Sequence, residues 1–378
     1  MHVHNTSHSY DCAVIGAGIV GMMCARELAK CGLKIALFDK GRAGMESSWA
    51  AGGILSPLYP WRESVTLQPL INLSQEMYPA LAEQLRETTG IDPEWLQCGM
   101  FVFGMDRDEL ASAVDWASKR NQQTELLNVT ALGQPHPATR QGSNDALFLP
   151  SVAQIRNPFL SEALKRDLES RGVTIYENTS VERLRTTAGT LQSVTTSQGD
   201  FRTGLAVTAM GAWNSDLIPA LDIRPVRGQM LCYQAPAGLI SSIILDRGTY
   251  IIPRKDGHLL VGSTLEEVGF NKNTSEDAAR QLSSNAVRIL PAIEQFPLVR
   301  HWAGLRPATR SGLPCICAHP DIKGLYLNVG HYRNGILLAP GSAQLLADIV
   351  MHRETSIDSA RFEFSQHRGR EDHPEAVQ

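Results

Sequence analysis

The amino-acid sequence predicts an α/β fold that combines a parallel sheet with a separate antiparallel sheet. Residues 10–38 have the pattern of a strand, a glycine-rich turn, a helix and a second strand. A buried strand that ends in a glycine returns at 205–211 and at 325–330, which predicts a return to the same sheet. Residues 229–263 contain short strands and a Lys-Asp-Gly turn, a pattern typical of antiparallel hairpins.

Length and composition are those of a globular protein with two domains. The chain has 378 residues, of which 43% are hydrophobic and 20% are charged, enough for a core that encloses a ligand. A net charge of −4 without basic blocks argues against nucleic-acid binding. The seven cysteines include no CxxC pair, which favours free thiols in a reducing compartment. We therefore expect a cytoplasmic protein, and no apolar run is long enough for a transmembrane segment.

The first βαβ unit carries three glycines with separate physical roles. Gly16 permits a tight turn after the strand, Gly18 lets the backbone approach a pyrophosphate, and Gly21 lets the helix pack against the strand. The helix start then offers free N–H groups and a positive dipole end. Asp39 ends the second strand, where a carboxylate can accept hydrogen bonds from a ribose. This spacing predicts a Rossmann-like dinucleotide site but does not choose between NAD and FAD.

A run of small residues follows at 47–54, with the sequence SSWAAGGI. Small side chains allow the backbone to lie against a flat ligand, whereas the alternative is a flexible loop with one buried tryptophan. Further along the chain we expect helices at 67–89, 107–121, 157–171 and 274–290. Strands are expected at 99–104, 173–176, 205–209, 229–234, 249–254, 258–263 and 325–329. The polar stretch 128–145 is predicted to be a surface loop.

The C-terminal part repeats the strand–glycine–helix order in the stretch 330–340, GHYRNGILLAP. Four polar or aromatic residues precede an apolar helix, so a second helix N-terminus faces a ligand with polar groups around it. Pro340 is expected to kink this helix or to mark a short first segment.

The order GAGIVG, SSWAAGGI, AMGAW, WAGLRPATR and GHYRNGILLAP resembles the D-amino acid oxidase family of flavoproteins, and within it the glycine oxidases. The resemblance covers roughly residues 10 to 365. It implies non-covalent FAD and oxidation of an amine next to a carboxylate. A hydride would pass from the α-carbon to flavin N5, and O2 would restore the flavin and give hydrogen peroxide. The imine would hydrolyse to an oxo acid and ammonia or feed thiamin thiazole synthesis.

The resemblance also assigns the cofactor residues. The pyrophosphate would be held by Gly16, Gly18, Ile19, Val20 and Gly21. The ribose would contact Asp39 and Lys40, the adenine would contact the backbone of Val181, and Gly211 would close the strand beside them. The pyrophosphate, ribityl chain and ring would lie along Ser47, Ser48, Gly52, Gly53 and Ile54. The turn at the pyrimidine end would consist of His331, Tyr332, Arg333, Asn334, Gly335, Ile336 and Leu337.

For the substrate, the resemblance assigns the carboxylate to Arg306, assisted by Tyr250, with Arg333 at the same pocket. No side chain is expected to act as a catalytic residue, because the flavin carries the chemistry. A planar guanidinium suits a carboxylate because it donates two parallel hydrogen bonds. Structural salt bridges for the two arginines and a core position for the tyrosine remain alternatives. His331 is expected to use its backbone rather than to act as a base.

The chain departs from the family pattern at Ser311, where relatives usually carry an acid, and at 246–249, just before Tyr250. Cys315 and Cys317 allow a metal or redox pair, but two small residues at a strand end are the simpler interpretation. In the covalent sarcosine oxidase relatives a cysteine anchors the flavin; here we expect no covalent link.

We expect an FAD-binding domain built from 10–88, 150–218 and 300–365. The substrate domain would take 89–149 and 219–299, with flexible tails at 1–9 and 366–378. The resemblance implies a small amino acid substrate, O2 as electron acceptor and a homo-oligomer. Two alternatives stay open: a flavin dehydrogenase that uses a quinone or a protein as acceptor, and an FAD-binding protein without catalysis.

Overall fold

The computed structural model describes residues 9–128 and 145–366. The predicted tails, apart from residues 9 and 366, and nearly all of the predicted loop at 128–145 lie outside the described residues. Within the described ranges, no helix is both long and apolar enough to cross a membrane.

The predicted parallel sheet is confirmed. It has six strands in the order β18-β19-β12-β1-β2-β8, parallel except for the β18–β19 pair at one edge. Its strands are β1 (Cys12–Ile15), β2 (Ile35–Phe38), β8 (Thr174–Tyr176), β12 (Leu205–Thr208), β18 (Cys315–Ala318) and β19 (Leu325–Val329). The central strand β1 is fully buried, because it has a neighbour on each side and helices against it.

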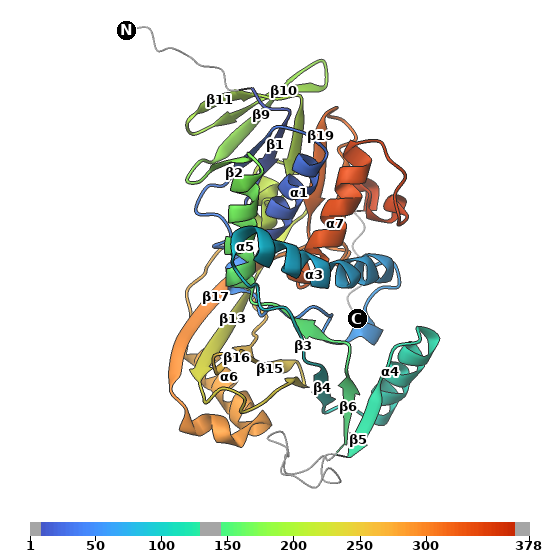
Figure 1. The fold of residues 1–378 in the computed structure, drawn as a ribbon, viewed down its shortest axis with the longest axis vertical. Helices are drawn as coiled ribbons and strands as arrows, with labels where there is room; N and C mark the ends of the chain where they lie inside the picture. Colours follow the sequence, from blue (N-terminus) through green and yellow to red (C-terminus); the bar gives the residue numbers. More distant parts are fainter. Residues whose placement is uncertain (1–8, 129–144, 367–378) are drawn as a thin grey trace.

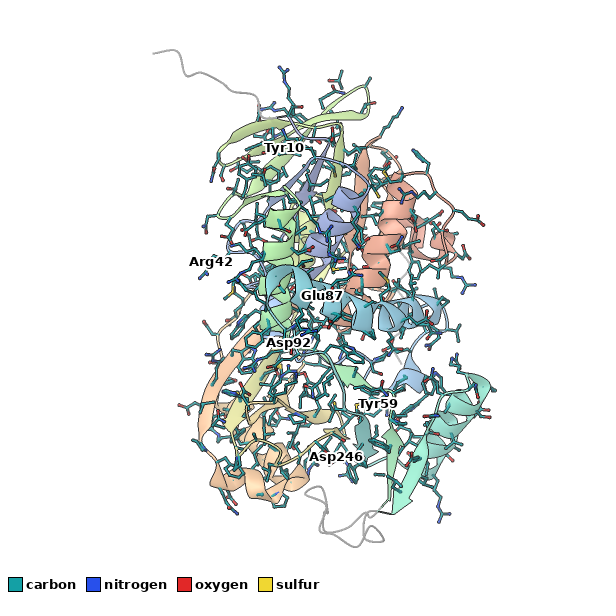
Figure 2. The ribbon with its side chains drawn as sticks, in the orientation of Figure 1. Tyr10, Arg42, Tyr59, Glu87, Asp92 and Asp246 are labelled. Carbon is teal, nitrogen blue, oxygen red and sulfur yellow. The ribbon has the colours of Figure 1, made fainter. Side chains whose placement is uncertain are left out.

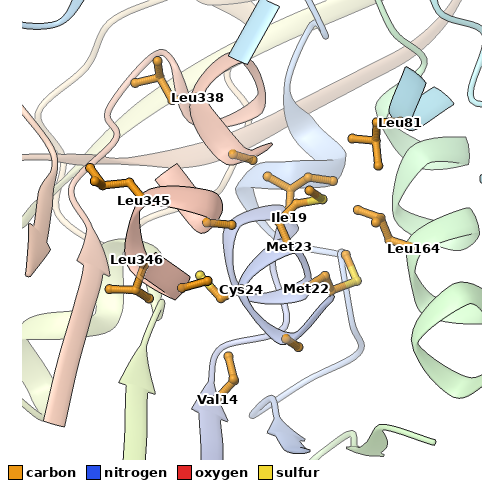
Figure 3. Packing of buried hydrophobic residues seen from close by; sticks show 14 of the residues in the cluster. Val14, Ile19, Met22, Met23, Cys24, Leu81, Leu164, Leu338, Leu345 and Leu346 are labelled. Carbon is orange, nitrogen blue, oxygen red and sulfur yellow. The ribbon is translucent and has the colours of Figure 1, made fainter. Parts of the chain in front are cut away.

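Four helices pack together beside this sheet in the upper half of Figure 1. They are α1 (Ile19–Lys30), α3 (Gln68–Thr89), α5 (Asn157–Ser170) and α7 (Gly335–Val350). Helix α1 contacts both α7 and α5, and α3 contacts α7. Figure 3 shows their shared core, where Met23 of α1 lies between Leu338 of α7 and Leu164 of α5.

Helix α7 runs from Gly335 through Pro340 to Val350, so the expected short first segment is wrong, whereas the alternative of a kink at Pro340 stays a prediction. A proline at position 340 removes the backbone N–H that would donate to the carbonyl of Ile336. In this fold the hydroxyl of Tyr78 donates to that carbonyl instead. The hydroxyl of Ser74, also on α3, accepts a hydrogen bond from Gly341 N at 3.2 Å. Helix α3 therefore supplies hydrogen-bond partners for the backbone groups of α7 near the proline.

A three-stranded antiparallel sheet, which sequence analysis did not predict, consists of β9 (Val181–Thr187), β10 (Thr190–Thr196) and β11 (Gly199–Arg202). Strand β10 buries Leu191 and Val194, whereas β9 and β11 are mostly exposed, and Ala188 and Gly189 turn the first hairpin with φ of +46° and +73°. The strands carry few large apolar residues, which hid the pattern.

The second large sheet has eight strands in the order β17-β13-β16-β15-β14-β4-β6-β5 and fills the lower half of Figure 1. Its strands are β4 (Met100–Phe103), β5 (Glu125–Asn128), β6 (Asp145–Leu149), β13 (Arg224–Gln234), β14 (Ile243–Asp246), β15 (Thr249–Pro253), β16 (His258–Gly262) and β17 (Leu298–Ala308). The predicted hairpin is confirmed as β15–β16, and all neighbours are antiparallel except β14 and β4.

The two faces of this sheet have different surroundings. Helix α6 (Glu276–Ile289) covers one face and buries Leu282 and Ala286 against it. The other face presents Met230, Tyr250 and Ile252, which belong to a separate cluster. Strand β17 lies in this sheet and spans the predicted domain boundary at residue 300, so the division into domains remains a proposal. The remaining α-helices and strands are α2 (Ser47–Ala50), β3 (Leu96–Gln97), α4 (Arg107–Lys119) and β7 (Ala153–Gln154).

Candidate functional site

A cavity of about 1280 Å³ has walls from both large sheets. The parallel sheet contributes the turn after β1 and the end of β2, and the antiparallel sheet contributes parts of β13, β15 and β17. All predicted site residues line this cavity except Gly21 and Leu337. The structure therefore brings together segments that lie more than 300 residues apart in the chain.

The glycine-rich turn is tightly packed at two positions. Gly16 has φ of +103°, and a Cβ there would collide with the carbonyl oxygen of Ala209 on the neighbouring strand. A Cβ on Gly21 would collide with the carbonyl oxygen of Gly16, so this glycine sets the approach of helix to strand. Gly21 thus shapes the turn from behind the cavity wall, which agrees with its predicted packing role.

The carboxylate of Asp39 braces the turn directly. Its oxygens accept hydrogen bonds from Ala17 N and from Gly41 N, each at 2.8 Å. Burial raises the pKa of Asp39, and these two hydrogen bonds oppose the increase. Asp39 also lines the cavity. It therefore stabilises the shape of the glycine-rich turn in addition to the ribose contact that the resemblance implies.

The run 47–54 is held on several sides, so the alternative of a flexible loop finds no support. The hydroxyl of Ser48 accepts a hydrogen bond from Ile19 N at 2.8 Å, at the start of α1. The amide of Asn157 donates to the carbonyl of Trp49 at 2.8 Å, and the indole of Trp302 donates to the carbonyl of Ala50 at 3.0 Å.

Lys40, Val181 and Gly211 all line the cavity. The ammonium of Lys40 lies 3.4 Å from the ring centroid of Trp213, a residue of the AMGAW stretch to which sequence analysis gave no role of its own. Burial lowers the pKa of Lys40. Gly211 has φ of +56°, which allows the chain to turn from β12 into the segment that carries this tryptophan.

The turn at 330–336 also lines the cavity. Tyr332 has φ of +47°, and its N–H donates to the carbonyl of Pro307 at 3.0 Å. Helix α7 then starts after Asn334, whose side chain makes no capping hydrogen bond. Ile336 lines the cavity, whereas Leu337 is buried in the helix core. The start of α7 thus faces the cavity with its positive dipole end.

His331 is 4% exposed, and its Nε2 has no hydrogen-bond partner among the described residues. Burial lowers the pKa of His331 to about 3. The imidazole is therefore neutral at physiological pH and does not match a base that must gain a proton there. A buried ring nitrogen without a partner is a polar group that a bound ligand could satisfy.

We expect His331 to make the protein less stable in mild acid. Because its folded pKa of about 3 lies below the ordinary 6.5, the unfolded chain binds the proton more tightly. The stability present above pH 6.5 is therefore lost as pH falls toward 3, by at most about 1.4 kcal/mol per pH unit. Urea unfolding at a fixed excess of FAD between pH 7 and 4.5 measures this loss.

His331→Gln should unfold with a weaker pH dependence than the unchanged protein. His352 is exposed, so His352→Gln is the matched control and should keep the original dependence. Equal pH dependence in all three proteins would contradict the expected burial of a neutral imidazole.

Arg306 is partly buried at the face of β17 that borders the cavity. Its guanidinium donates to the hydroxyl of Ser263 at 2.7 Å and to the carbonyl of Thr264 at 3.2 Å. Burial lowers its pKa; the neighbouring Tyr250 opposes this and Arg333 adds to it. None of the described carboxylates lies within 4.0 Å of this guanidinium, so a structural salt bridge finds no support.

The surroundings of Arg306 are shaped by glycines. A Cβ on Gly228 would collide with the Arg306 guanidinium, so the arginine lies flat against β13. A Cβ on Gly262 would lie 2.7 Å from the hydroxyl of Tyr250, whose ring crosses β16 in the same way. The Tyr250 hydroxyl also contacts the sulfur of Met230 at 3.9 Å. These glycines leave room for both side chains at the cavity.

The mouth of the cavity contains residues that sequence analysis missed. Burial raises the pKa of Glu63, and a hydrogen bond from Asn334 and the charge of Arg333 oppose the increase. Arg333 is itself exposed. The hydroxyl of Tyr59, labelled in Figure 2, accepts a hydrogen bond from Gly248 N at 2.8 Å. The segment 57–63, which contains two prolines, gave no signal for these contacts, because their partners lie far away in the sequence.

The two cysteines of the predicted alternative pair lie on β18, with their sulfurs 3.6 Å apart. Both are buried and neither lines the cavity. The described residues hold no group of three or more His, Cys, Asp or Glu side chains suited to a metal ion. Ser311 also lies away from the cavity lining, and its hydroxyl accepts a hydrogen bond from Leu313 N at 3.2 Å.

A family model described as FAD dependent oxidoreductase matches residues 11–349. The chain belongs to this family. The glycine oxidase of Pseudomonas aeruginosa is 40% identical over 354 residues, which cover 92% of this chain and 97% of that protein. The bifunctional protein ThiO/ThiG of Synechocystis is 30% identical, covering 92% of this chain and 52% of that protein. The crystal structure of glycine oxidase from Geobacillus kaustophilus superposes with a TM-score of 0.90 at 33% identity, covering 96% of this chain and 100% of that chain.

These similarities confirm the predicted resemblance to the glycine oxidases, the predicted fold and the predicted cofactor. The protein is an enzyme that uses FAD. The cavity residues fit this cofactor. Glycines at 16 and 53 allow the cavity wall to pack closely on the backbone at Ala209 and Ile155, and α1 and α7 both start at the cavity. The unpartnered His331 nitrogen supplies a polar group for a ligand.

Proposed function

We propose that this enzyme oxidises glycine, or a small D-amino acid or N-methyl amino acid, through its amine. The observation that carries the proposal is Arg306: a partly buried guanidinium at the cavity with no carboxylate partner among the described residues. A carboxylate of the substrate would complete its hydrogen bonds and compensate its charge. The names of the relatives, glycine oxidases of 40% and 38% identity, support the same substrate class.

FAD would lie along the cavity wall that the parallel sheet and the turn at 331–336 provide. We propose that it is held by Gly16, Gly18, Ile19, Val20, Asp39, Lys40, Ser47, Ser48, Gly52, Gly53, Ile54, Val181, Gly211 and residues 331–336. Gly21 and Leu337 would act from behind this wall through packing. No cysteine lies in the cavity lining formed by the described residues, which supports non-covalent binding.

The chain's own side chains would bind and orient the substrate. Arg306 would clamp the carboxylate with two parallel hydrogen bonds, and the Tyr250 hydroxyl would donate a third. The backbone carbonyl of Arg333 would accept a hydrogen bond from the amine, which must be neutral before it is oxidised. When bound, FAD supplies the two-electron oxidation by accepting a hydride at N5, and O2 restores it with release of hydrogen peroxide.

The product side of the proposal is an imine, which hydrolyses to an oxo acid and ammonia or passes to another enzyme. The match to bifunctional proteins named ThiO/ThiG supports the place in thiamin thiazole synthesis that the sequence resemblance implies. We also propose that the protein is cytoplasmic and forms a homo-oligomer.

A substrate panel tests this function. Glycine, sarcosine and both enantiomers of small amino acids would be scored for flavin bleaching without oxygen and for peroxide after air is admitted. The proposal predicts that glycine or another small member of the panel bleaches the flavin and yields peroxide. Bleaching without peroxide, together with reduction of a dye, would favour the dehydrogenase. No bleaching by any member would favour a protein without this catalysis.

Gly228→Ala should raise KM for the amino acid while FAD stays bound. The added methyl group would take the place of the Arg306 guanidinium, which must move off β13. A displacement of about 1 Å in a positioning group commonly costs up to about a hundredfold in rate, so we expect at least a tenfold loss of kcat/KM.

Steady-state kinetics and the flavin absorbance of the purified variant measure both effects. Gly204→Ala is the matched control, because a Cβ at that position meets no atom within 4 Å. Unchanged kinetics in Gly228→Ala would mean that the position of Arg306 does not matter for the substrate.

A further inference from the structure

Arg254 is a buried arginine just after β15 that does not line the cavity. Its guanidinium makes hydrogen bonds with three neutral acceptors. One nitrogen donates to the side-chain oxygen of Gln154 at 2.7 Å and to the carbonyl of Ile155 at 3.1 Å. The other donates to the carbonyl of Gly52 at 2.8 Å. Among the described carboxylates, none lies within 4.0 Å of this guanidinium.

The acceptors of Arg254 belong to two backbone segments that lie against each other. Ile155 N donates to the carbonyl of Gly53 at 2.8 Å, and Leu55 N donates to the carbonyl of Ala153 at 2.9 Å. Gly53 has φ of +73°, and a Cβ there would collide with the carbonyl oxygen of Ile155. Only the segment 52–54 of this pair lines the cavity. Arg254 thus holds the cavity wall from behind.

Strand β15 also touches the same wall with its other side chains. A Cβ on Gly52 would lie 2.7 Å from the Cδ1 of Ile252 and 3.5 Å from the Cε2 of Tyr250. Residues 250, 252 and 254 share one face of the strand because side chains alternate with a period of two. One strand face therefore carries the proposed substrate tyrosine, a packing contact and the arginine that binds Gly52.

A buried cation is costly unless its hydrogen bonds are satisfied, and here neutral oxygens satisfy them. Burial lowers the pKa of Arg254 to about 10, so the side chain stays charged at neutral pH. Lysine could not replace it, because a single ammonium lacks the planar fork that reaches two segments at once.

We propose that Arg254 is a positioning residue that fixes the 52–54 backbone on β15, and so sets the distance between the bound cofactor and the bound substrate. The inference rests on the proposed substrate site at Tyr250 and Arg306, and on the cofactor wall at 47–54. Arg254 touches neither ligand. It acts through the carbonyl of Gly52 and through the strand that it shares with Tyr250.

The test compares Arg254→Met and Arg254→Lys as holoenzymes with the unchanged protein. The readouts are the FAD dissociation constant, the visible absorption and circular dichroism of the bound flavin, and separate kcat and KM values. We expect Arg254→Met to bind FAD about tenfold more weakly and to lose about tenfold or more in kcat. Its flavin spectrum should change and KM should change less than kcat. Arg254→Lys should keep more FAD affinity than Arg254→Met but stay low in kcat.

Arg156→Met is the matched control. Arg156 lies nearby and pairs with Glu94 at 3.4 Å and with Asp256 at 2.7 Å, and it does not line the cavity. The Arg156→Met variant should keep the FAD affinity, the flavin spectrum and the kcat of the unchanged protein. If Arg254→Met or Arg254→Lys also kept all three, the proposal would be overturned.

If both Arg254 variants fail to fold, the Gln154→Leu variant tests the proposal instead. It removes one acceptor of Arg254 at a buried position outside the cavity. A fall in kcat with a changed flavin spectrum supports the proposal, and unchanged values overturn it. The FAD readouts do not depend on the substrate. A panel without any active amino acid would therefore refute the proposed function and leave the test of Arg254 intact.

Discussion

Arg306→Ala is expected to raise KM for the amino acid substrate by about a hundredfold or more and to leave FAD bound. The guanidinium is partly buried; it donates to Ser263 and Thr264 and also interacts with Tyr250. A substrate carboxylate at this site would therefore lose a charge-assisted pair, and partial burial strengthens such hydrogen bonds. FAD should remain bound because its proposed wall at 47–54 makes its own contacts.

Stopped-flow reduction without oxygen would measure the substrate constant, and flavin absorbance would measure occupancy. Arg306→Lys keeps the charge but not the planar fork, so its constant should fall between those of the unchanged protein and Arg306→Ala. Arg310→Ala is the matched control, because Arg310 is exposed and pairs with Asp222 at 3.4 Å. A normal constant in Arg306→Ala would remove this residue from the substrate site.

Gly16→Ala is expected to yield a folded protein almost without FAD. The backbone at Gly16 has φ of +103°, which alanine adopts only at a cost. The added Cβ would also collide with the carbonyl oxygen of Ala209, a backbone atom of the neighbouring sheet segment that cannot move aside. Relief requires the whole turn to shift, and the turn is the part of the cavity that would face the pyrophosphate.

The flavin-to-protein absorbance ratio after purification, followed by FAD titration, measures this loss. Gly32→Ala is the matched control, because Gly32 has φ of +85° but no atom lies within 4 Å of the added Cβ. It shares the backbone strain without the collision and should carry normal FAD. Full occupancy in Gly16→Ala would show that the turn tolerates displacement.

The fold could be predicted where local pattern and tertiary structure agree. The first βαβ unit and the β15–β16 hairpin are local arrangements, and their turn residues mark them in the sequence. Helix α7 differs, because its passage through Pro340 depends on the Tyr78 hydroxyl from α3, more than 250 residues earlier. The sheet of β9 to β11 was missed because its exposed strands carry mostly polar residues.

The residues of the candidate site could likewise be predicted only where the local sequence is specific. Arg306 stood out because its sequence neighbours form a specific stretch, and the structure places it at the cavity. Arg254 lies in a stretch that was assigned only to a hairpin, since the sequence does not reveal that Gly52 and Gln154 come to meet it. Glu63 is similar: its interaction with Asn334 joins segments that no local pattern connects.

The start of α7 has a consequence for the order of events during synthesis. One part of the cavity wall comes from residues 330–336, near the end of the chain, and α7 packs against α1 from near its beginning. A ribosome must therefore synthesise and release the residues through α7 before the cofactor site is complete. Until then, α1 lacks the packing that α7 provides, and the cavity lacks the wall formed by residues 330–336. We therefore expect flavin loading to follow the synthesis of α7, and FAD supply to stabilise chains that include α7 over chains that end before it.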